Sequence, residues 1–150
     1  MYSIDFNQNL IKGVMLIDID KLNPHEKIIE KKKSSLAKFI KSYESYYIIS
    51  SIVCCHDSLL IIDGHHRYFA LKELGFKKVP VTLINYKSDS IRTGKINPLD
   101  KKYIIDTGKS SVLLEPKSTE HAVYCNKSKN WEPIILLSSM FKIETKEIIK

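Results

Sequence analysis

Cysteine is scarce in this 150-residue chain, which contains only Cys54, Cys55 and Cys125. The number is odd, and the C-x-x-C spacing typical of zinc ribbons and redox motifs does not occur. Cys54 and Cys55 are adjacent, so on a strand their side chains would point to opposite faces of the sheet. The sequence therefore argues against a disulfide scaffold and against a zinc ribbon.

Long apolar runs are also missing. No stretch approaches the roughly 20 apolar residues that a membrane-spanning helix needs, and acidic residues interrupt the apolar positions of the N-terminal segment MYSIDFNQNLIKGVMLIDID. Neither a membrane span nor a signal peptide is indicated, so we expect a soluble, cytoplasmic protein without a membrane partner. With 43% apolar residues and no internal repeat, the chain suits one globular domain.

The charge balance favours an anionic partner. The net charge is +7 and the isoelectric point is near 9.2. Lysine is spread along the chain, and the only dense run is EKKK at residues 30–33. A nucleotide would satisfy this charge as well as DNA would.

Hydrophobic periodicity predicts a compact mixed α/β (α+β) fold. Leu36, Phe39, Ile40 and Tyr43 have the spacing of one helical face, and Gly75 can end the helix that carries Tyr68, Leu71 and Leu74. The expected elements are a strand over 14–19, a helix over 30–43, strands over 46–55 and 59–63, a helix ending before 75, a strand over 77–86, a short helix over 99–106 and a strand from about 121.

The segment DGHHR, residues 63–67, joins an expected strand to an expected helix. Either Asp63 or Gly64 can cap this helix. His65, His66 and Arg67 place donors and positive charge at a helix end that is already positive, at a cost of about 0.3–1 kcal/mol per charge. A bound phosphate would offset this cost, and Gly64 would let the backbone approach it. The alternative is an Asp-Gly turn with solvated histidines, and local spacing leaves both open.

Three motifs in order extend this interpretation. DGHHRYFALKELGFKKVPV resembles the signature of the ParB/sulfiredoxin superfamily, in which a Gly-x-x-Arg turn opens a helix that ends at G-x-x-x-V-P-V. LNPHE, residues 22–26, and LLEPKSTEH, residues 113–121, are similar to motifs of the free L-serine kinases of that superfamily. The resemblance implies transfer of a phosphoryl group from ADP or ATP to the serine hydroxyl, giving O-phospho-L-serine. The matching residues of the first motif are Gly64, Arg67, Ala70, Gly75, Val79, Pro80 and Val81.

The resemblance also implies roles for individual residues. Glu26 is the expected general base, with His25 supporting it, and Asp63 is a second catalytic candidate that would hold Mg²⁺. The residues expected to bind the nucleotide or its phosphates are Gly64, His65, His66, Arg67, Lys117, Ser118, Thr119 and His121. Simpler readings stay open: Glu26 as a solvated loop acid, Asp63 as an N-cap, His66 as a packing residue, and the Ser118–Thr119 pair as a cap or turn.

The resemblance implies a compact ParB/sulfiredoxin-like domain with a small mixed sheet and flanking helices. Residues 1–125 are expected to form this nucleotide-binding catalytic domain, and residues 126–150 a C-terminal extension packed on it. The rival function is a ParB-like module that binds CTP or ATP, with a DNA-binding or regulatory role and no kinase activity. Because residues 87–150 show no clustered basic recognition helix, nucleic acid is the less favoured partner.

Two other chemistries are disfavoured. Sulfiredoxin chemistry would need a cysteine where His65 stands, and the histidines together with Cys125 lack convincing metal-ligand spacing. The sequence leaves open the preference between ADP and ATP, the acceptor hydroxyl, the pathway and the oligomeric state.

Overall fold

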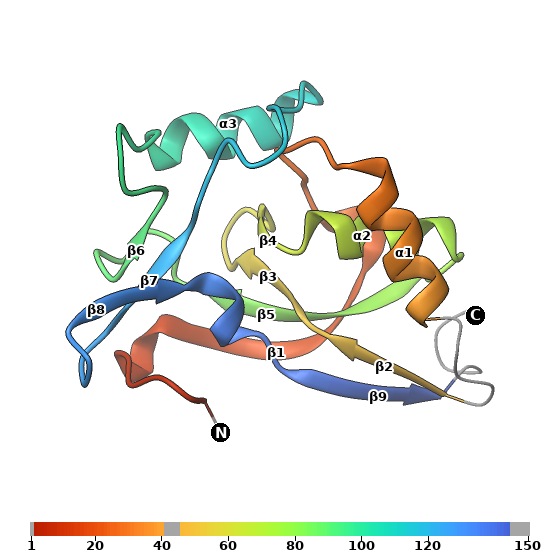
Figure 1. Cartoon of the computed structure of the whole chain (residues 1–150), viewed down its shortest axis with the longest axis horizontal. Coiled ribbons are helices and arrows are strands. Elements are labelled where there is room, and N and C mark those ends of the chain that lie inside the picture. Colours follow the sequence, from red (N-terminus) through yellow and green to blue (C-terminus); the bar gives the residue numbers. More distant parts are fainter. Residues whose placement is uncertain (1, 41–45, 145–150) are drawn as a thin grey trace.

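The structure, a computed structural model, describes residues 2–40 and 46–144 and is drawn in Figure 1. Its strands are β1 (Ile11–Asp18), β2 (Tyr46–Ser50), β3 (Ile52–Cys55), β4 (Ile61–Asp63), β5 (Lys78–Ile84), β6 (Ile91–Arg92), β7 (Ala122–Cys125), β8 (Asn130–Pro133) and β9 (Met140–Glu144). The helices are α1 (Glu30–Ile40), α2 (His65–Glu73) and α3 (Lys101–Ser110), and short 3-10 turns are η1 (Gln8–Leu10), η2 (Ile19–Lys21) and η3 (Ile134–Leu137). The expected mixed α/β class is confirmed.

The main sheet has the strand order β1-β5-β3-β4. β5 runs antiparallel to β1 and parallel to β3, so the sheet is mixed, as expected. Two smaller sheets complete the fold, the pair β2-β9 and the three strands β6-β7-β8. In Figure 1 α1 and α2 lie together beside the main sheet, and α3 lies at the end nearest the β3–β4 connection.

Both faces of the main sheet are covered, which explains why β3 is an uninterrupted apolar run. Cys54 packs in a cluster that includes Leu71 of α2, whereas Cys55 packs in a second cluster that includes Ile104 of α3. The two adjacent thiols therefore point to opposite faces, as expected for a strand, and both are buried and free.

Two expected helices differ from the structure. The helix expected over 30–43 is described up to Ile40, and residues 41–43 lie outside the described residues. Its buried face runs through Ala37 and Ile40, whereas Phe39 is 57% exposed, so placing Phe39 on the core face was wrong. The short helix expected over 99–106 is α3, which continues to Ser110 through Gly108; a Cβ there would lie 2.5 Å from Leu60 Cδ1.

The chain beyond residue 125 is hydrogen-bonded to the rest of the fold. β8 pairs with the neighbouring strand β7, whereas β9 pairs with β2, which lies in the first third of the sequence. The division of the chain at residue 125 stays a prediction, and residues 145–150 of the expected extension lie outside the described residues. Within the described part of the chain, no helix has both the length and the apolar character needed to cross a bilayer.

Candidate active site

The turn from β4 into α2 is built around Gly64. Its φ of 104° lies in the left-handed region, and its carbonyl accepts a helical hydrogen bond from Tyr68 N at 2.8 Å. Gly64 is therefore the N-cap, and no side chain caps the first turn of α2, which also contains no acidic residue. Arg67 folds back over the glycine and donates from Nη1 to Ser51 O at 3.2 Å. This leaves a helix N-terminus suited to an anion.

The loop with the LNPHE motif is fixed to α2 by two histidine side chains. His65 Nε2 accepts a hydrogen bond from His25 N at 3.1 Å, and His66 Nε2 accepts one from Ile29 N at 2.9 Å. Because each Nε2 accepts, each neutral ring carries its proton on Nδ1. His65 and His66 thus position the loop that carries Glu26, in addition to any contact with a ligand.

A second contact fixes the other side of this loop. Leu114 N donates to His25 O at 2.8 Å, and Lys27 N donates to Leu114 O at 2.6 Å. These bonds form a parallel bridge between Glu26 and Leu114. The LNPHE and LLEPKSTEH motifs, separated by about ninety residues in sequence, therefore lie side by side.

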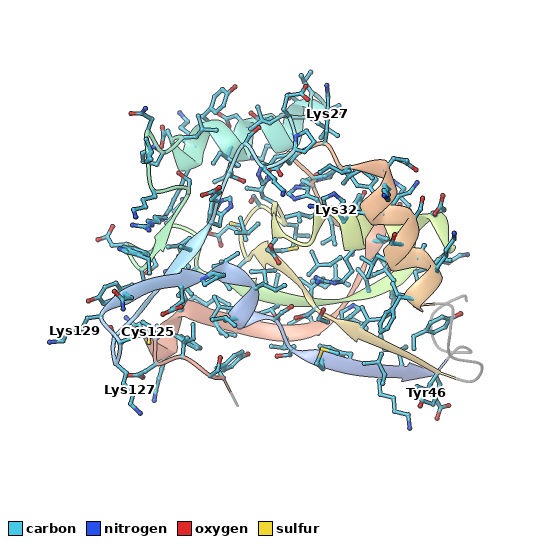
Figure 2. The ribbon with its side chains drawn as sticks, viewed as in Figure 1. Lys27, Lys32, Tyr46, Cys125, Lys127 and Lys129 are labelled. Atoms are coloured by element: carbon cyan, nitrogen blue, oxygen red, sulfur yellow. The ribbon has the colours of Figure 1, made fainter. Side chains whose placement is uncertain are left out.

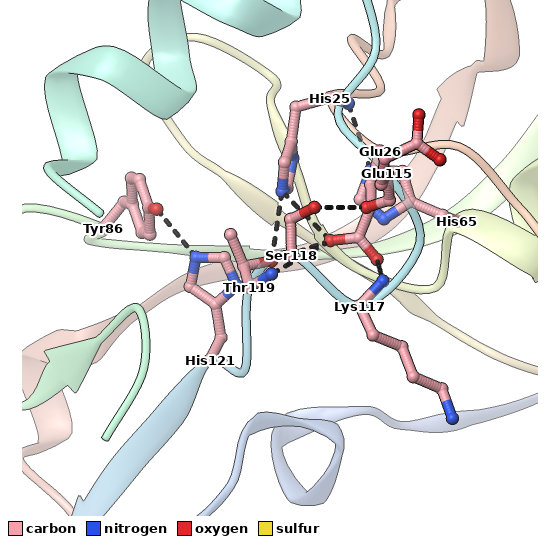
Figure 3. Close-up of polar contacts among 9 residues, drawn as sticks. All are labelled: His25, Glu26, His65, Tyr86, Glu115, Lys117, Ser118, Thr119 and His121. Carbon is pink, nitrogen blue, oxygen red and sulfur yellow. Dashed lines mark hydrogen bonds and ion pairs between the residues drawn. The ribbon is translucent and has the colours of Figure 1, made fainter. Parts of the chain in front are cut away.

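The Glu26 carboxylate accepts hydrogen bonds from the second of these motifs (Figure 3). Lys117 N donates to Oε1 at 2.5 Å, and Thr119 donates to Oε2 from its hydroxyl at 2.9 Å and from its backbone N at 3.4 Å. Burial raises the pKa of Glu26, while these hydrogen bonds lower it and the nearby Asp63 raises it further. Glu26 is thus an oriented, partly desolvated carboxylate, which suits a proton acceptor.

A group of buried imidazoles lies behind Glu26. The ring centroids of His25 and His65 are 4.6 Å apart, and those of His25 and His121 are 5.9 Å apart. Burial lowers the pKa of His25 to about 4 and that of His121 to about 3. Burial, followed by its histidine neighbours, holds the pKa of His65 well below its ordinary value. The three imidazoles are therefore uncharged at neutral pH. His121 also has a hydrogen-bond partner, since Tyr86 Oη lies 2.7 Å from its Nε2.

A cavity of about 360 Å³ opens at the β4–α2 turn, within the range of about 300–1,000 Å³ found for small-molecule sites. Nine of the residues selected from the sequence line it: Glu26, Asp63, Gly64, His65, His66, Arg67, Lys117, Thr119 and His121. His25 lies behind Glu26, with its Nε2 3.9 Å from Glu26 Oε2. Ser118 lines a neighbouring cavity, and its hydroxyl donates to Glu115 O.

Other cavity residues were not selected from the sequence. Lys32 and Leu36 come from α1, and Ile62 and Glu120 are neighbours of selected residues. Pro133, Ile134 and Ile135 form an apolar part of the wall and come from the region expected to be an extension. The dense EKKK run is the one sequence signal at Lys32, and it indicates no more than general positive charge.

Asp63, the last residue of β4, also lines this cavity. Burial raises its pKa, and the charge of Arg67 opposes that rise. Within residues 2–40 and 46–144, no group of three or more histidine, cysteine or acidic side chains could hold a metal ion. A metal here would need ligands from a bound molecule.

In sequence, about half of the chain is similar to curated L-serine kinases. It is 41% identical over 80 residues to the ATP-dependent L-serine kinase of Staphylothermus marinus, covering 52% of this chain and 32% of that protein. It is 30% identical over 80 residues to the ADP-dependent L-serine kinase of Thermococcus kodakarensis, covering 52% of this chain and 33% of that protein.

A third relative is a ParB-like protein of Sulfolobus acidocaldarius, 32% identical over 76 residues, covering 51% of this chain and 37% of that protein. The chain spans about a third of the length of the curated relatives it matches. A solved free serine kinase in complex with AMP is 26% identical with a TM-score of 0.48, covering 64% of this chain and 43% of that one. No family model matches the chain. The resemblance seen in the motifs, to free L-serine kinases and ParB-like proteins, is confirmed in these relatives.

Proposed function

We propose that the protein is a free L-serine kinase, which transfers a phosphoryl group from ADP or ATP to the serine hydroxyl. The observation that carries the proposal is the position of Glu26: an oriented carboxylate lines the same cavity as the N-terminus of α2, which no side chain caps. A kinase for a small alcohol needs a proton acceptor and a phosphate site next to each other. The curated relatives named as ATP- and ADP-dependent L-serine kinases support the same assignment.

The cavity offers separate surfaces for the parts of a nucleotide. The backbone N–H groups at the start of α2, with Arg67 and Gly64, suit the phosphates. The apolar wall at residues 133–135 suits a nucleobase, which is flat and weakly polar on its faces. The serine acceptor would then approach Glu26.

A magnesium ion fits this arrangement. Mg²⁺ prefers oxygen ligands, keeps several waters and is usually bound through one or two carboxylates together with substrate phosphates. Asp63 lies in the cavity beside the phosphate-binding turn and is the residue that would hold it. The ion would neutralise charge on the phosphates during transfer.

The proposed step is an in-line displacement. Serine Oγ attacks the terminal phosphorus while its proton passes to Glu26, and the bond from that phosphorus to the bridging oxygen breaks. The products are O-phospho-L-serine and AMP or ADP, according to the donor. The three donors from Lys117 and Thr119 hold the Glu26 carboxylate for this proton transfer.

A nucleotide-binding module without kinase activity is the second candidate. The similarity to the Sulfolobus acidocaldarius ParB-like protein favours it. Such a module would use the same turn at Gly64 and Arg67 but would have no need for Glu26. Cytoplasmic location and the absence of a nucleic-acid partner stay predictions.

The test is direct. The protein is incubated with L-serine, Mg²⁺ and either ADP or ATP, and phosphoserine is followed by ³¹P NMR or mass spectrometry. Phosphoserine formation with either donor is the expected result, and L-threonine and a reaction without acceptor serve as comparisons. Tight nucleotide binding without phosphoserine from either donor would contradict the proposal and favour the module.

A further inference from the structure

Two lysines from distant parts of the chain meet at the cavity. Lys32 is on α1 (Figure 2), and Lys117 is in the loop that holds Glu26. Both line the cavity, and their ammonium groups lie next to each other. Neither the kinase-like motifs nor the helix pattern indicated that Lys32 belongs to the site.

This contact is electrostatically unfavourable without an anion. The proximity of Lys117 lowers the pKa of Lys32. The pKa of His66 is lowered as well, mainly by burial and then by the charges of the two lysines. In the part of the chain that the structure describes, neither ammonium has a carboxylate partner within ion-pairing distance. The adjacent Lys33, by contrast, bonds both Glu30 and Glu73. Positive charge is thus concentrated at one point of the cavity wall.

The backbone at Lys117 adds a second observation. Its φ is 60°, in the left-handed region, where a residue other than glycine is disfavoured by about 1–2 kcal/mol. This conformation directs its backbone N–H to Glu26 while the side chain extends away from the carboxylate (Figure 3). Strain of this kind is concentrated at functional sites. One residue therefore holds the carboxylate with its backbone and presents its ammonium at a distance from it.

We propose that Lys32 and Lys117 form a clamp for the terminal phosphate of a di- or triphosphate bound in this cavity. The identification of that anion as the phosphoryl donor rests on the proposed function. An anion held by the two ammonium groups is separated from Glu26 by the length of the Lys117 side chain. This separation keeps the anion away from the negative Glu26 carboxylate and leaves room between them for an acceptor hydroxyl. Helix α1 thereby becomes part of the phosphate site.

The experiment compares Lys32→Gln and Lys117→Gln with Lys31→Gln. Lys31 is also an exposed lysine of α1 but does not line the cavity, so its variant has the same change in net charge. The Lys117 variant keeps the backbone N–H that holds Glu26. Pyrophosphate, ADP and AMP are titrated into each protein by calorimetry. We expect Lys32→Gln and Lys117→Gln to weaken pyrophosphate and ADP binding about tenfold or more, with AMP affinity unchanged, and Lys31→Gln to bind all three as the wild type does.

The outcomes separate the clamp from the kinase. Failure of the wild type to bind pyrophosphate, or equal affinity in the Lys32→Gln and Lys31→Gln proteins, would overturn the clamp even if phosphoserine is formed. An equal loss of AMP and ADP affinity would also overturn it, because the lysines would then act on the whole nucleotide. If the lysine variants lose affinity for pyrophosphate and ADP only, and the wild type forms no phosphoserine, the clamp would be supported and the kinase assignment contradicted.

Discussion

The Thr119 hydroxyl lies 2.9 Å from Glu26 Oε2 and 3.3 Å from His25 Nε2, so it links the carboxylate to the buried imidazole behind it. Its hydrogen bond to Glu26 lowers the pKa of that carboxyl, against the effect of burial. In Thr119→Val this bond is lost and the pKa of Glu26 rises. Because a general base must be deprotonated, the acidic limb of the kcat profile should move to higher pH.

The control for this prediction is Thr119→Ser, which keeps the hydroxyl and should restore the wild-type profile. The measurement is phosphoserine formation at saturating substrate over the acidic range. A valine profile that superimposes on the wild type would mean that the hydroxyl has no effect on the base.

Replacing Glu26 itself tests its role as proton acceptor. Glu26→Gln is nearly isosteric but cannot accept the serine proton, so kcat should fall about 10²–10⁴-fold while the nucleotide Kd changes little. Glu115→Gln, at a residue with a 75% exposed side chain, is the matched control and should keep wild-type turnover. Equal losses of turnover and nucleotide affinity in the Glu26 variant would assign it a structural role.

The turn glycine can be tested with a matched pair of substitutions. Gly64 and Gly75 both have left-handed φ values, of 104° and 85°, so alanine strains both by about 1–2 kcal/mol. A Cβ at Gly64 would lie 2.8 Å from Arg67 Nη1, whereas a Cβ at Gly75 has no atom within 4 Å. Gly64→Ala should therefore weaken ADP binding about tenfold by displacing one charge-assisted contact, and Gly75→Ala should lower only the Tm. Similar ADP affinities in the two variants would show that Arg67 does not depend on this turn.

What the sequence predicted well is local. The strand, the Asp-Gly turn, the following helix and its stop at Gly75 are contiguous, so residue types and periodicity are sufficient to place them. The same holds for the opposite orientations of Cys54 and Cys55.

What the sequence could not show depends on contacts between distant segments. The pairing of β2 with β9 and the meeting of Lys32 with Lys117 leave no periodic signal. Phe39 has the spacing of a core residue, but packing against α2 places Ala37 and Ile40 inward instead. The motifs selected most of the cavity, while the apolar wall at 133–135 required the fold.

Metal dependence follows from the position of Asp63. Removing divalent cations with EDTA should abolish phosphoserine formation, and adding Mg²⁺ should restore it. Asp63→Asn keeps the shape but loses the carboxylate, so it should require a higher Mg²⁺ concentration for half-maximal activity. An unchanged Mg²⁺ requirement in this variant would mean that the ion is held by the nucleotide and water without Asp63.

The buried histidines predict a dependence of stability on acid. The folded protein holds three histidines in the neutral form, because burial lowers their pKa values below the ordinary 6.5: His25, His65 and His121. Below pH 6.5 the unfolded chain binds protons that the folded chain excludes, so each of these groups destabilises the fold as the pH falls. Each histidine lowers the free energy of unfolding by about 1.4 kcal/mol for every pH unit below 6.5. This loss continues down to about pH 4 for His25 and to about pH 3 for His121.

The raised pKa values of Glu26 and Asp63 act in the opposite direction over part of this range, because the folded chain then binds the extra protons. The readout is therefore the difference between variants in urea unfolding at a series of pH values. His121→Gln keeps a hydrogen-bonding group for Tyr86 but has no proton to gain, so its free energy of unfolding should depend less steeply on pH between 6.5 and 4. Equal slopes in the variant and the wild type would show that His121 takes up its proton in the folded protein as readily as in the unfolded chain, and its hydrogen bond with Tyr86 would then have to be reassigned.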